Sequence, residues 1–279
     1  MSSLNQGLSE RHFRSIVSLI ETEVGIQLPA AKRTMLEGRL RKRVRALDLD
    51  GLDAYGRHLF EDGHLDEEYV HLVDCVTTNK TDFFREPAHF DLLRKQLVPS
   101  LATRRAGTTR LKLWSAAASI GAEAYTLAMV LQDMVAAGQD LDYSILGTDV
   151  STEVLKIGRT AIYTTEMLAT VPPEVRRRYV MTARDPGRQE ARIVPELRAR
   201  VRFQHLNLMA DRYNVDRDMD VVFCRNVLIY FDKPTQRAVL QQISDHVRPG
   251  GYIVVGHSES MAGSGLTHMT QISSTVFRK

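Results

Sequence analysis

The chain has few of the residues that mark disulfide-rich or membrane-spanning proteins. Its 279 residues include only two cysteines, Cys75 and Cys224, which lie far apart and lack metal-ligand spacing. A disulfide framework is therefore excluded, and we expect reduced thiols in a cytoplasmic protein. No segment approaches 18 consecutive apolar residues, and the polar start MSSLNQGLSERH does not resemble a signal peptide. We therefore expect no membrane insertion.

The chain also lacks the glycine-rich loop that cradles a pyrophosphate. Between an apolar run at residues 111–114 and a helical pattern at 123–135 stands a loop of small residues with one glycine, Gly121, and no G-x-G-x-x-G. The next apolar run, 143–147, is followed by Asp149, a position from which a carboxylate can bind both ribose hydroxyls. Such βαβ units are common in parallel α/β proteins. This one favours a nucleoside without a pyrophosphate, such as S-adenosylmethionine (AdoMet).

Charge is nearly balanced overall but not locally. The formal net charge of +3 says little about partners, yet residues 32 to 45 hold seven basic side chains against one acid, Glu37. The basic residues are Lys32, Arg33, Arg39, Arg41, Lys42, Arg43 and Arg45. A solvated helix face is the ordinary interpretation, but this density favours an anionic partner, either nucleic acid or an acidic protein surface. No stacking aromatics are interleaved with these charges, as single-strand binders normally require.

After the first ninety residues, which read as helices, apolar strands alternate with helical patterns. Two strand patterns are followed by polar residues: Asn207 after 201–205, and Arg225 with Asn226 after 219–223. Residues at the carboxyl ends of parallel strands face the ligand crevice. The sequence therefore predicts a doubly wound α/β domain preceded by a helical bundle.

These patterns also predict domain boundaries. The all-helical domain with the basic helix would span residues 1–77, and a linker that contacts the cofactor would span 78–90. The α/β domain would span 91–279. Prolines and basic residues punctuate short strand patterns within it, which predicts a small antiparallel β-subdomain at about 175–200.

Six segments resemble, in order and at compatible spacing, the bacterial chemotaxis receptor methyltransferases of the CheR family. They are TTNKTDFFRE, LWSAAASIGAEAYTLAM, GTDVSTEVLKIGRTAIY, FQHLNLM, VVFCRNVLIYFD and RPGGYIVVGHSES. The resemblance extends from about residue 10 to the C-terminus. It implies a class I AdoMet-dependent methyltransferase with a Rossmann-like sheet. The implied reaction transfers a methyl group from AdoMet to receptor glutamates, giving glutamyl methyl esters and S-adenosylhomocysteine, and serves adaptation in chemotaxis signalling.

The resemblance also implies roles for individual residues. Arg85 and Tyr230 would lie near the incoming glutamate and the methyl group, which makes them the predicted catalytic residues. The implied cofactor-binding positions are Asn79, Thr81, Arg85, Glu123, Asp149, Asn207, Leu208, Arg225 and Asn226. Among these, Asp149 would bind the ribose, Asn207 and Leu208 would flank the adenine, and no metal is expected. The chain departs from the family at Ala122, where a carboxylate is usual, and at Ala124, where proline is usual.

The chemistry agrees with the lack of an evident base. A glutamate with a pKa of about 4.3 is already ionised at neutral pH, so methyl transfer to it requires no proton abstraction. The protein mainly has to align oxygen, carbon and sulfur and to exclude water. We interpret His257 and Cys224 as structural residues rather than as a base and a nucleophile.

The expected partners are methyl-accepting chemotaxis receptors, whose methylation helices are acidic. Lys32, Arg39 and Arg43 would form the substrate-docking face, and the β-subdomain would bind a C-terminal tether peptide of the receptor. We expect a monomer that binds no nucleic acid. The alternative is a non-catalytic AdoMet-sensing signalling module of the same fold, although retention of Asn79, Arg85, Asp149, Asn226 and Tyr230 favours the enzyme.

Overall fold

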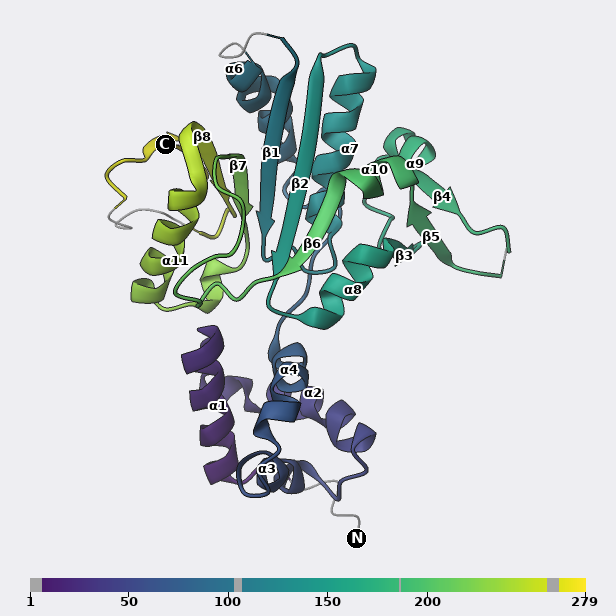
Figure 1. Ribbon diagram of the computed structural model, residues 1–279. Helices are drawn as coiled ribbons and strands as arrows, with labels where there is room; N and C mark the ends of the chain where they lie inside the picture. Colours follow the sequence, from purple (N-terminus) through teal and green to yellow (C-terminus); the bar gives the residue numbers. More distant parts are fainter. Residues whose placement is uncertain (1–6, 103–106, 186, 260–265) are drawn as a thin grey trace.

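The computed structural model describes residues 7–102, 107–185, 187–259 and 266–279 (Figure 1). Residues 1–6 of the predicted helical domain and Ser260, the last residue of the GHSES segment, lie outside these ranges. Within the described ranges, no helix is both long and apolar enough to span a bilayer.

Four helices form the N-terminal domain: α1 (Glu10–Val24), α2 (Arg33–Ala46), α3 (Leu52–Phe60) and α4 (Leu65–Val76). The first begins after Ser9, whose hydroxyl accepts a hydrogen bond from the His12 amide and so caps the helix. It ends at Gly25, whose φ of 76° only glycine adopts without strain. A short 3-10 turn, η2 (Ala30–Lys32), leads into α2. Periodic apolar residues such as Ile16, Ile20 and Leu40 are fully buried between the helices.

A seven-stranded sheet in the order β6-β2-β1-β7-β8-β10-β9 forms the centre of the second domain. Its strands are β1 (Thr109–Ala116), β2 (Leu141–Asp149), β6 (Val201–His205), β7 (Met219–Cys224), β8 (Val247–Val255), β9 (Thr270–Ser273) and β10 (Val276–Arg278). The first five in spatial order pair in parallel, whereas β10 and β9 pair antiparallel at the edge. The predicted class I methyltransferase fold, with its doubly wound sheet and N-terminal helical domain, is confirmed.

Both faces of the sheet are covered by helices. Successive strand residues enter opposite cores, since Leu113 packs in one hydrophobic cluster and Trp114 in the other. The helices are α5 (Pro87–Leu92), η3 (Leu93–Leu97), α6 (Val98–Ala102), α7 (Ala122–Ala136), α8 (Thr152–Thr160), α9 (Pro173–Tyr179), α10 (Pro195–Arg200), the 3-10 turn η4 (Leu228–Tyr230) and α11 (Lys233–His246). Strand β7 is therefore buried along its whole length, whereas β1 alternates between buried and exposed residues at its start and is continuously buried only toward its carboxyl end.

The small antiparallel sheet is present, in the order β3-β5-β4. Strands β4 (Val180–Thr182) and β5 (Glu190–Ile193) lie within the predicted 175–200 segment, but β3 (Ile162–Thr164) lies before it. Three residues are too few to show a strand period in the sequence. In Figure 1 this sheet projects from the side of the α/β domain beyond α8.

The segment Arg248-Pro249-Gly250-Gly251 contains the proline and glycines that stop a helix, and α11 does end just before it, at His246. The segment itself lies inside β8, a strand conformation that these residues do not indicate. The strand accommodates it through a register shift against β7 and a φ of 79° at Gly250.

The helical domain sits at the carboxyl ends of the parallel strands (Figure 1). The Gln27 amide donates to the Tyr230 carbonyl at 2.9 Å. The Asn207 amide group donates to the Glu23 carbonyl at 2.6 Å, and the Thr152 hydroxyl donates to Asp74 Oδ2 at 3.1 Å. These contacts join the ends of α1 and α4 to the loops that follow the strands.

Arg43 holds the helical domain together. Its Nε and Nη2 atoms donate to the two oxygens of Glu68 at 2.7 and 2.5 Å, and the Tyr55 hydroxyl also donates to Glu68. The Glu68 side chain is 5% exposed. Hydrogen bonds from Arg43 outweigh burial and hold the pKa of Glu68 below its ordinary value of 4.5.

We predict that Glu68→Gln lowers the free energy of unfolding by about 2 to 4 kcal/mol at pH 7, because Arg43 loses its buried partner. Since the folded pKa of Glu68 is depressed, the advantage of the wild type should be complete above about pH 4.5 and should disappear as the pH falls through that folded pKa. Urea unfolding at several pH values measures this. The exposed neighbour Glu67→Gln is the control, and equal losses in both variants would contradict the prediction.

Candidate AdoMet and methyl-transfer site

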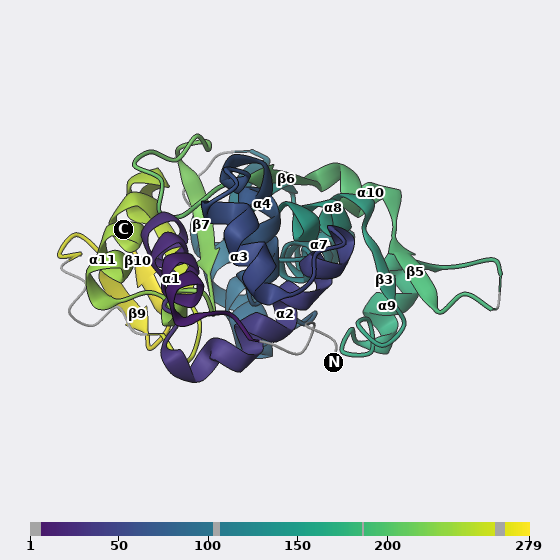
Figure 2. The same cartoon turned by 90° about the horizontal axis from the view of Figure 1, so that it is seen from below.

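A pocket opens where the helical domain meets the carboxyl ends of the strands. Figure 2, seen from below, shows α1 to α4 lying across that end of the sheet. The walls come from the end of α1, the linker, and the loops after β1, β2, β6 and β7. Apolar lining side chains include Val24, Ile26 and Phe231. A crevice at strand ends is the expected place for a nucleoside in a doubly wound fold.

The structure brings all ten predicted cofactor-binding and catalytic residues to this one pocket. They are Asn79, Thr81, Arg85, Glu123, Asp149, Asn207, Leu208, Arg225, Asn226 and Tyr230. They come from five separate segments of the chain, which only the fold brings together. The three predicted docking residues do not line the pocket.

The loop after β1 approaches the pocket in an unusual backbone conformation. Ala117 and Ser119 have φ values of 58° and 50°, and Gly121 has 86°. A Cβ at Gly121 would lie 2.6 Å from the ring of Phe203, so glycine is required there for packing as well as for its φ. This loop turns the Ser119 amide toward the next strand, where it donates to Asp149 Oδ2 at 2.8 Å.

Asp149 ends β2 as a buried acceptor. Its Oδ1 accepts from the Ser151 amide at 2.9 Å, and the residue is 7% exposed. Burial raises the pKa of the carboxyl, and the backbone amides of Ser151 and Ser119 oppose that rise. A carboxylate has about four acceptor positions, so the two amides leave capacity for a pair of hydroxyls. The residue fits the ribose of a nucleoside.

A buried ion network lies beside this acceptor. Arg225, with a side chain 2% exposed, has Nη1 2.8 Å from Glu123 Oε2 and Nη2 3.0 Å from Glu86 Oε2. Its Nη2 also donates to the Arg85 carbonyl at 2.6 Å, and its guanidinium lies over the rings of Phe90 and Phe223. Arg225 therefore ties the linker to β1, α7 and β7.

Glu86 and Glu123 are partners of this arginine. Burial pushes the pKa of Glu86 upward, but the Arg225 guanidinium holds it below the ordinary value. Glu123 also accepts from the Ser115 hydroxyl at 2.6 Å. Arg225, predicted as a cofactor-binding residue, therefore has two carboxylate partners beside the pocket.

The predicted catalytic residues reach the pocket from two different segments of the chain. Arg85 comes from the linker, where its Nη1 donates to the Lys80 carbonyl at 3.1 Å. Tyr230 closes the η4 turn, and the Lys32 ammonium lies 5.7 Å from its ring centroid. A carboxylate that enters the pocket would meet the Arg85 guanidinium and the Tyr230 phenol, groups that can orient it without removing a proton.

Three pocket-forming residues were not predicted as site residues. Glu86 stands before Pro87 and reads as part of a helix start, and Ser119 acts through its backbone. Glu259 lies behind the pocket and accepts hydrogen bonds from the backbone of residues 226–228. An acid in the short segment after a buried strand was the available signal for Glu259.

Among the described residues, one group could bring three metal-ligand atoms together. Atoms of Glu86, His89 and His257 lie within 4.8 Å of one another. A divalent cation there would face the Arg225 guanidinium, 3.0 Å from the Glu86 carboxylate, and would compete with it. We therefore assign Glu86 to the ion pair.

The structural interpretation of Cys224 is confirmed, because it is fully buried and burial raises the pKa of its thiol well above the ordinary range.

The basic helix divides into internal and exposed charges. Arg39 Nη1 donates to the carbonyls of Val76 and Thr77, and Arg43 is paired with Glu68. Lys32, at the start of α2, lies beside Tyr230 at the pocket. Most of the predicted docking charge is therefore used to hold α2 against α4 and the linker.

Comparison with known proteins gives a consistent result. Residues 79–277 match the family model described as "CheR methyltransferase, SAM binding domain". Residues 11–77 match the family model described as "CheR methyltransferase, all-alpha domain". A chemotaxis protein methyltransferase of Salmonella typhimurium is 39% identical over 257 residues, covering 91% of this chain and 85% of that protein. One of Escherichia coli is 39% identical, covering 91% and 86%. Chemotaxis protein methyltransferase 2 of Pseudomonas aeruginosa is 35% identical, covering 95% and 91%.

We predict that Arg225→Met lowers the free energy of unfolding by about 3 to 5 kcal/mol, because Glu86 and Glu123 would remain buried without a cation. Thermal and urea unfolding at pH 7 measure this loss. Arg85→Met is the matched control, since it removes an arginine from the same pocket whose guanidinium donates to the Lys80 carbonyl rather than to a buried carboxylate. Comparable losses in the two variants would show that Arg225 does not hold the site together.

Proposed function

The chain belongs to the CheR methyltransferase family, and on this premise we propose that it transfers a methyl group from AdoMet to glutamate side chains of chemotaxis receptors. Family membership makes it an AdoMet-dependent methyltransferase, since its match to the SAM binding domain covers most of the chain. The named relatives, which it matches over more than nine-tenths of its length, are chemotaxis protein methyltransferases.

One observation carries the residue assignments. All ten positions that the family resemblance relates to AdoMet or to the methyl group line a single pocket. The pocket combines a buried ribose-type acceptor, apolar walls for a base and an acidic network. That combination suits a ligand with two hydroxyls, a flat ring and a cationic amino acid end.

We assign the roles of the chain's own residues from these contacts. Asp149 binds the ribose hydroxyls and Leu208 packs against the adenine. Asn207 fixes the loop that carries Leu208 by donating to the Glu23 carbonyl. Bound AdoMet supplies an electrophilic methyl group on a sulfonium. The Arg225 network holds Arg85 and Asn226 beside the amino acid end, because Arg225 donates to the Arg85 carbonyl and Asn226 donates to Glu86.

Arg85 and Tyr230 act on the incoming carboxylate. A receptor glutamate arrives ionised, and its oxygen forms a bond to the methyl carbon while the carbon–sulfur bond breaks with its electron pair on sulfur. No proton is transferred, so these residues orient the carboxylate and displace its water. The methyl ester and S-adenosylhomocysteine are the products.

The receptor is the substrate class, and we further propose where it docks. Lys32 marks the docking site, because it is the basic residue of the 32–45 run that contacts Tyr230. An acidic receptor helix can extend from there along the exposed charges of α2, such as Lys42 and Arg45. Arg39 and Arg43 support this face from within.

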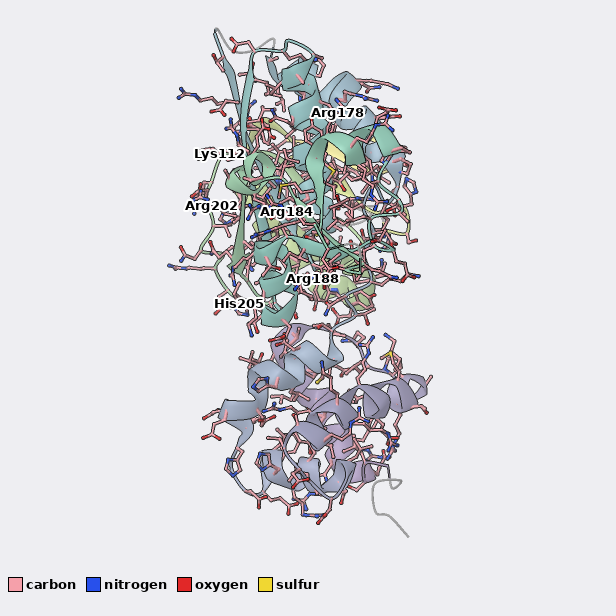
Figure 3. All side chains as sticks on the ribbon, turned by 90° about the vertical axis from the view of Figure 1, so that its right-hand side faces the viewer. Lys112, Arg178, Arg184, Arg188, Arg202 and His205 are labelled. Carbon is pink, nitrogen blue, oxygen red and sulfur yellow. The ribbon has the colours of Figure 1, made fainter. Side chains whose placement is uncertain are left out.

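We also propose that the small sheet binds a C-terminal tether peptide of the receptor, that the protein is a monomer and that it works in the cytoplasm. Basic side chains gather around the small sheet, where Figure 3 labels Arg178, Arg184 and Arg188. Nothing in the described residues or in the named relatives supports the non-catalytic sensing alternative.

We predict that the wild-type protein transfers radiolabelled methyl from AdoMet to chemoreceptor-containing membranes, and that alkali releases the label as volatile methanol.

Tyr230→Phe should lower kcat by roughly 10- to 100-fold with AdoMet binding changed less than about threefold, because the hydroxyl orients the carboxylate during transfer. Tyr69→Phe, in the helical domain, is the control. AdoMet binding without base-labile label on any of several receptors would refute the proposed function.

We predict that Lys32→Met raises the KM for receptor by about 3- to 10-fold at low salt, with kcat and AdoMet binding little changed, since a charge at the rim acts mainly on association. Lys95→Met removes an exposed lysine of the α/β domain that neither lines the pocket nor belongs to the proposed docking face, and it serves as the control. Charge reversal at Arg43 is avoided because it would disrupt the Glu68 pair. An unchanged KM in Lys32→Met would remove Lys32 from the docking site.

A further inference from the structure

The loop that carries Asn226 and Tyr230 is held from behind by one carboxylate. Glu259, 6% exposed, follows β8 in the segment Gly256-His257-Ser258-Glu259. Its Oε2 accepts from the amides of Gly256 at 2.7 Å and Asn226 at 2.8 Å. Its Oε1 accepts from the amides of Val227 at 2.8 Å and Leu228 at 2.7 Å.

Three of these four bonds fix successive residues, Asn226, Val227 and Leu228, the first two of which line the pocket. Asn226 has a φ of 58°, a left-handed conformation that a non-glycine residue adopts only when its surroundings impose it. The amides of Val227 and Leu228 open the η4 turn, and Tyr230 closes that turn. The carboxylate therefore sets both the strained residue and the direction of the turn.

The end of β8 packs tightly against the loop that carries Asn226. A Cβ at Gly256 would lie 2.8 Å from Asn226 Nδ2, 2.8 Å from Glu259 Oε2 and 3.1 Å from the Asn226 amide nitrogen. Glycine is therefore required for the strand end to approach the loop this closely. A shift of Glu259 would be transmitted directly to Asn226.

Glu259 does not itself reach the reacting groups. It is absent from the residues that line the pocket, whereas Arg225, Asn226, Val227 and Tyr230 line it. Four amide donors occupy its two oxygens, so its role is to accept hydrogen bonds from the backbone rather than to exchange protons with a substrate.

We propose that Glu259 is a positioning residue for methyl transfer, which sets Asn226 and Tyr230 through its four backbone hydrogen bonds. The inference rests on the proposed function, because the effect is on the transfer step. A glutamine would place an NH₂ donor against two of the four backbone donors, so charge and acceptor number both matter at this position.

The test compares E259Q with D220N. Asp220 is also a buried acid, 1% exposed, but at the opposite end of β7, where it accepts from the Lys112 amide and pairs with Arg248 of β8. Both variants remove a buried carboxylate between β7 and its surroundings. E259Q should lower kcat by roughly 10- to 100-fold with the KM for AdoMet changed less than about threefold, because small misplacements act on the transfer step. D220N should lower the melting temperature and keep kcat.

Amide hydrogen exchange gives a readout independent of turnover. The amides of residues 226–228 should be protected in the wild type and should exchange faster in E259Q than in D220N. If the wild type methylates no receptor, the proposed function fails, while exchange still reports whether Glu259 holds the loop.

Several results would overturn the inference: a folded E259Q with wild-type kcat, equal losses of kcat in E259Q and D220N, or unchanged exchange at residues 226–228. If E259Q does not fold, G256A decides, since its methyl group pushes directly on Asn226 and Glu259 and should reproduce the selective loss of kcat. Loss of folding in both variants would make Glu259 a structural residue of the domain and would also overturn the inference.

Discussion

The site depends on one buried cation. Arg225 lies at the end of β7 and pairs with Glu123 from the start of α7 and with Glu86 from the end of the linker. Removing a charge from water is costly, and this arginine is stable inside the protein only because both carboxylates and the Arg85 carbonyl reach it. The linker, the start of α7 and the end of β7 are therefore positioned together, and the pocket forms between them.

The remaining polar groups of the pocket follow the same pattern. Asp149 accepts from the amides of Ser119 and Ser151, and Glu259 accepts from four amides around residues 226–228. Each carboxylate fixes a stretch of backbone, and that backbone positions the side chains that line the pocket. Such an arrangement suits a reaction in which alignment supplies the catalysis and no proton moves. It also explains why a base constellation was not evident in the sequence.

In the helical domain, basic residues that the sequence suggested for a partner instead bind groups of the same chain. Seven basic residues between Lys32 and Arg45 suggested a docking face, but Arg43 binds Glu68 and Arg39 binds the carbonyls before the linker. Glu68, Val76 and Thr77 are distant in sequence, so their use of these charges could not be predicted. What remains for a partner is Lys32 at the pocket and the exposed charges beyond it.

The sequence by itself determined the elements and their order. Helical periodicity located the helices, apolar runs located the central strands, and residues after strand ends marked most of the pocket, because these signals are local. Only the tertiary structure decided which polar groups meet. The pairing of Arg225 with Glu86 and Glu123, the support of Asn226 by Glu259, the third strand of the small sheet and the strand conformation of Arg248 to Gly251 all depend on contacts between distant segments. Such contacts leave no periodic trace in the chain, since a buried charge is stable only beside partners that folding brings to it.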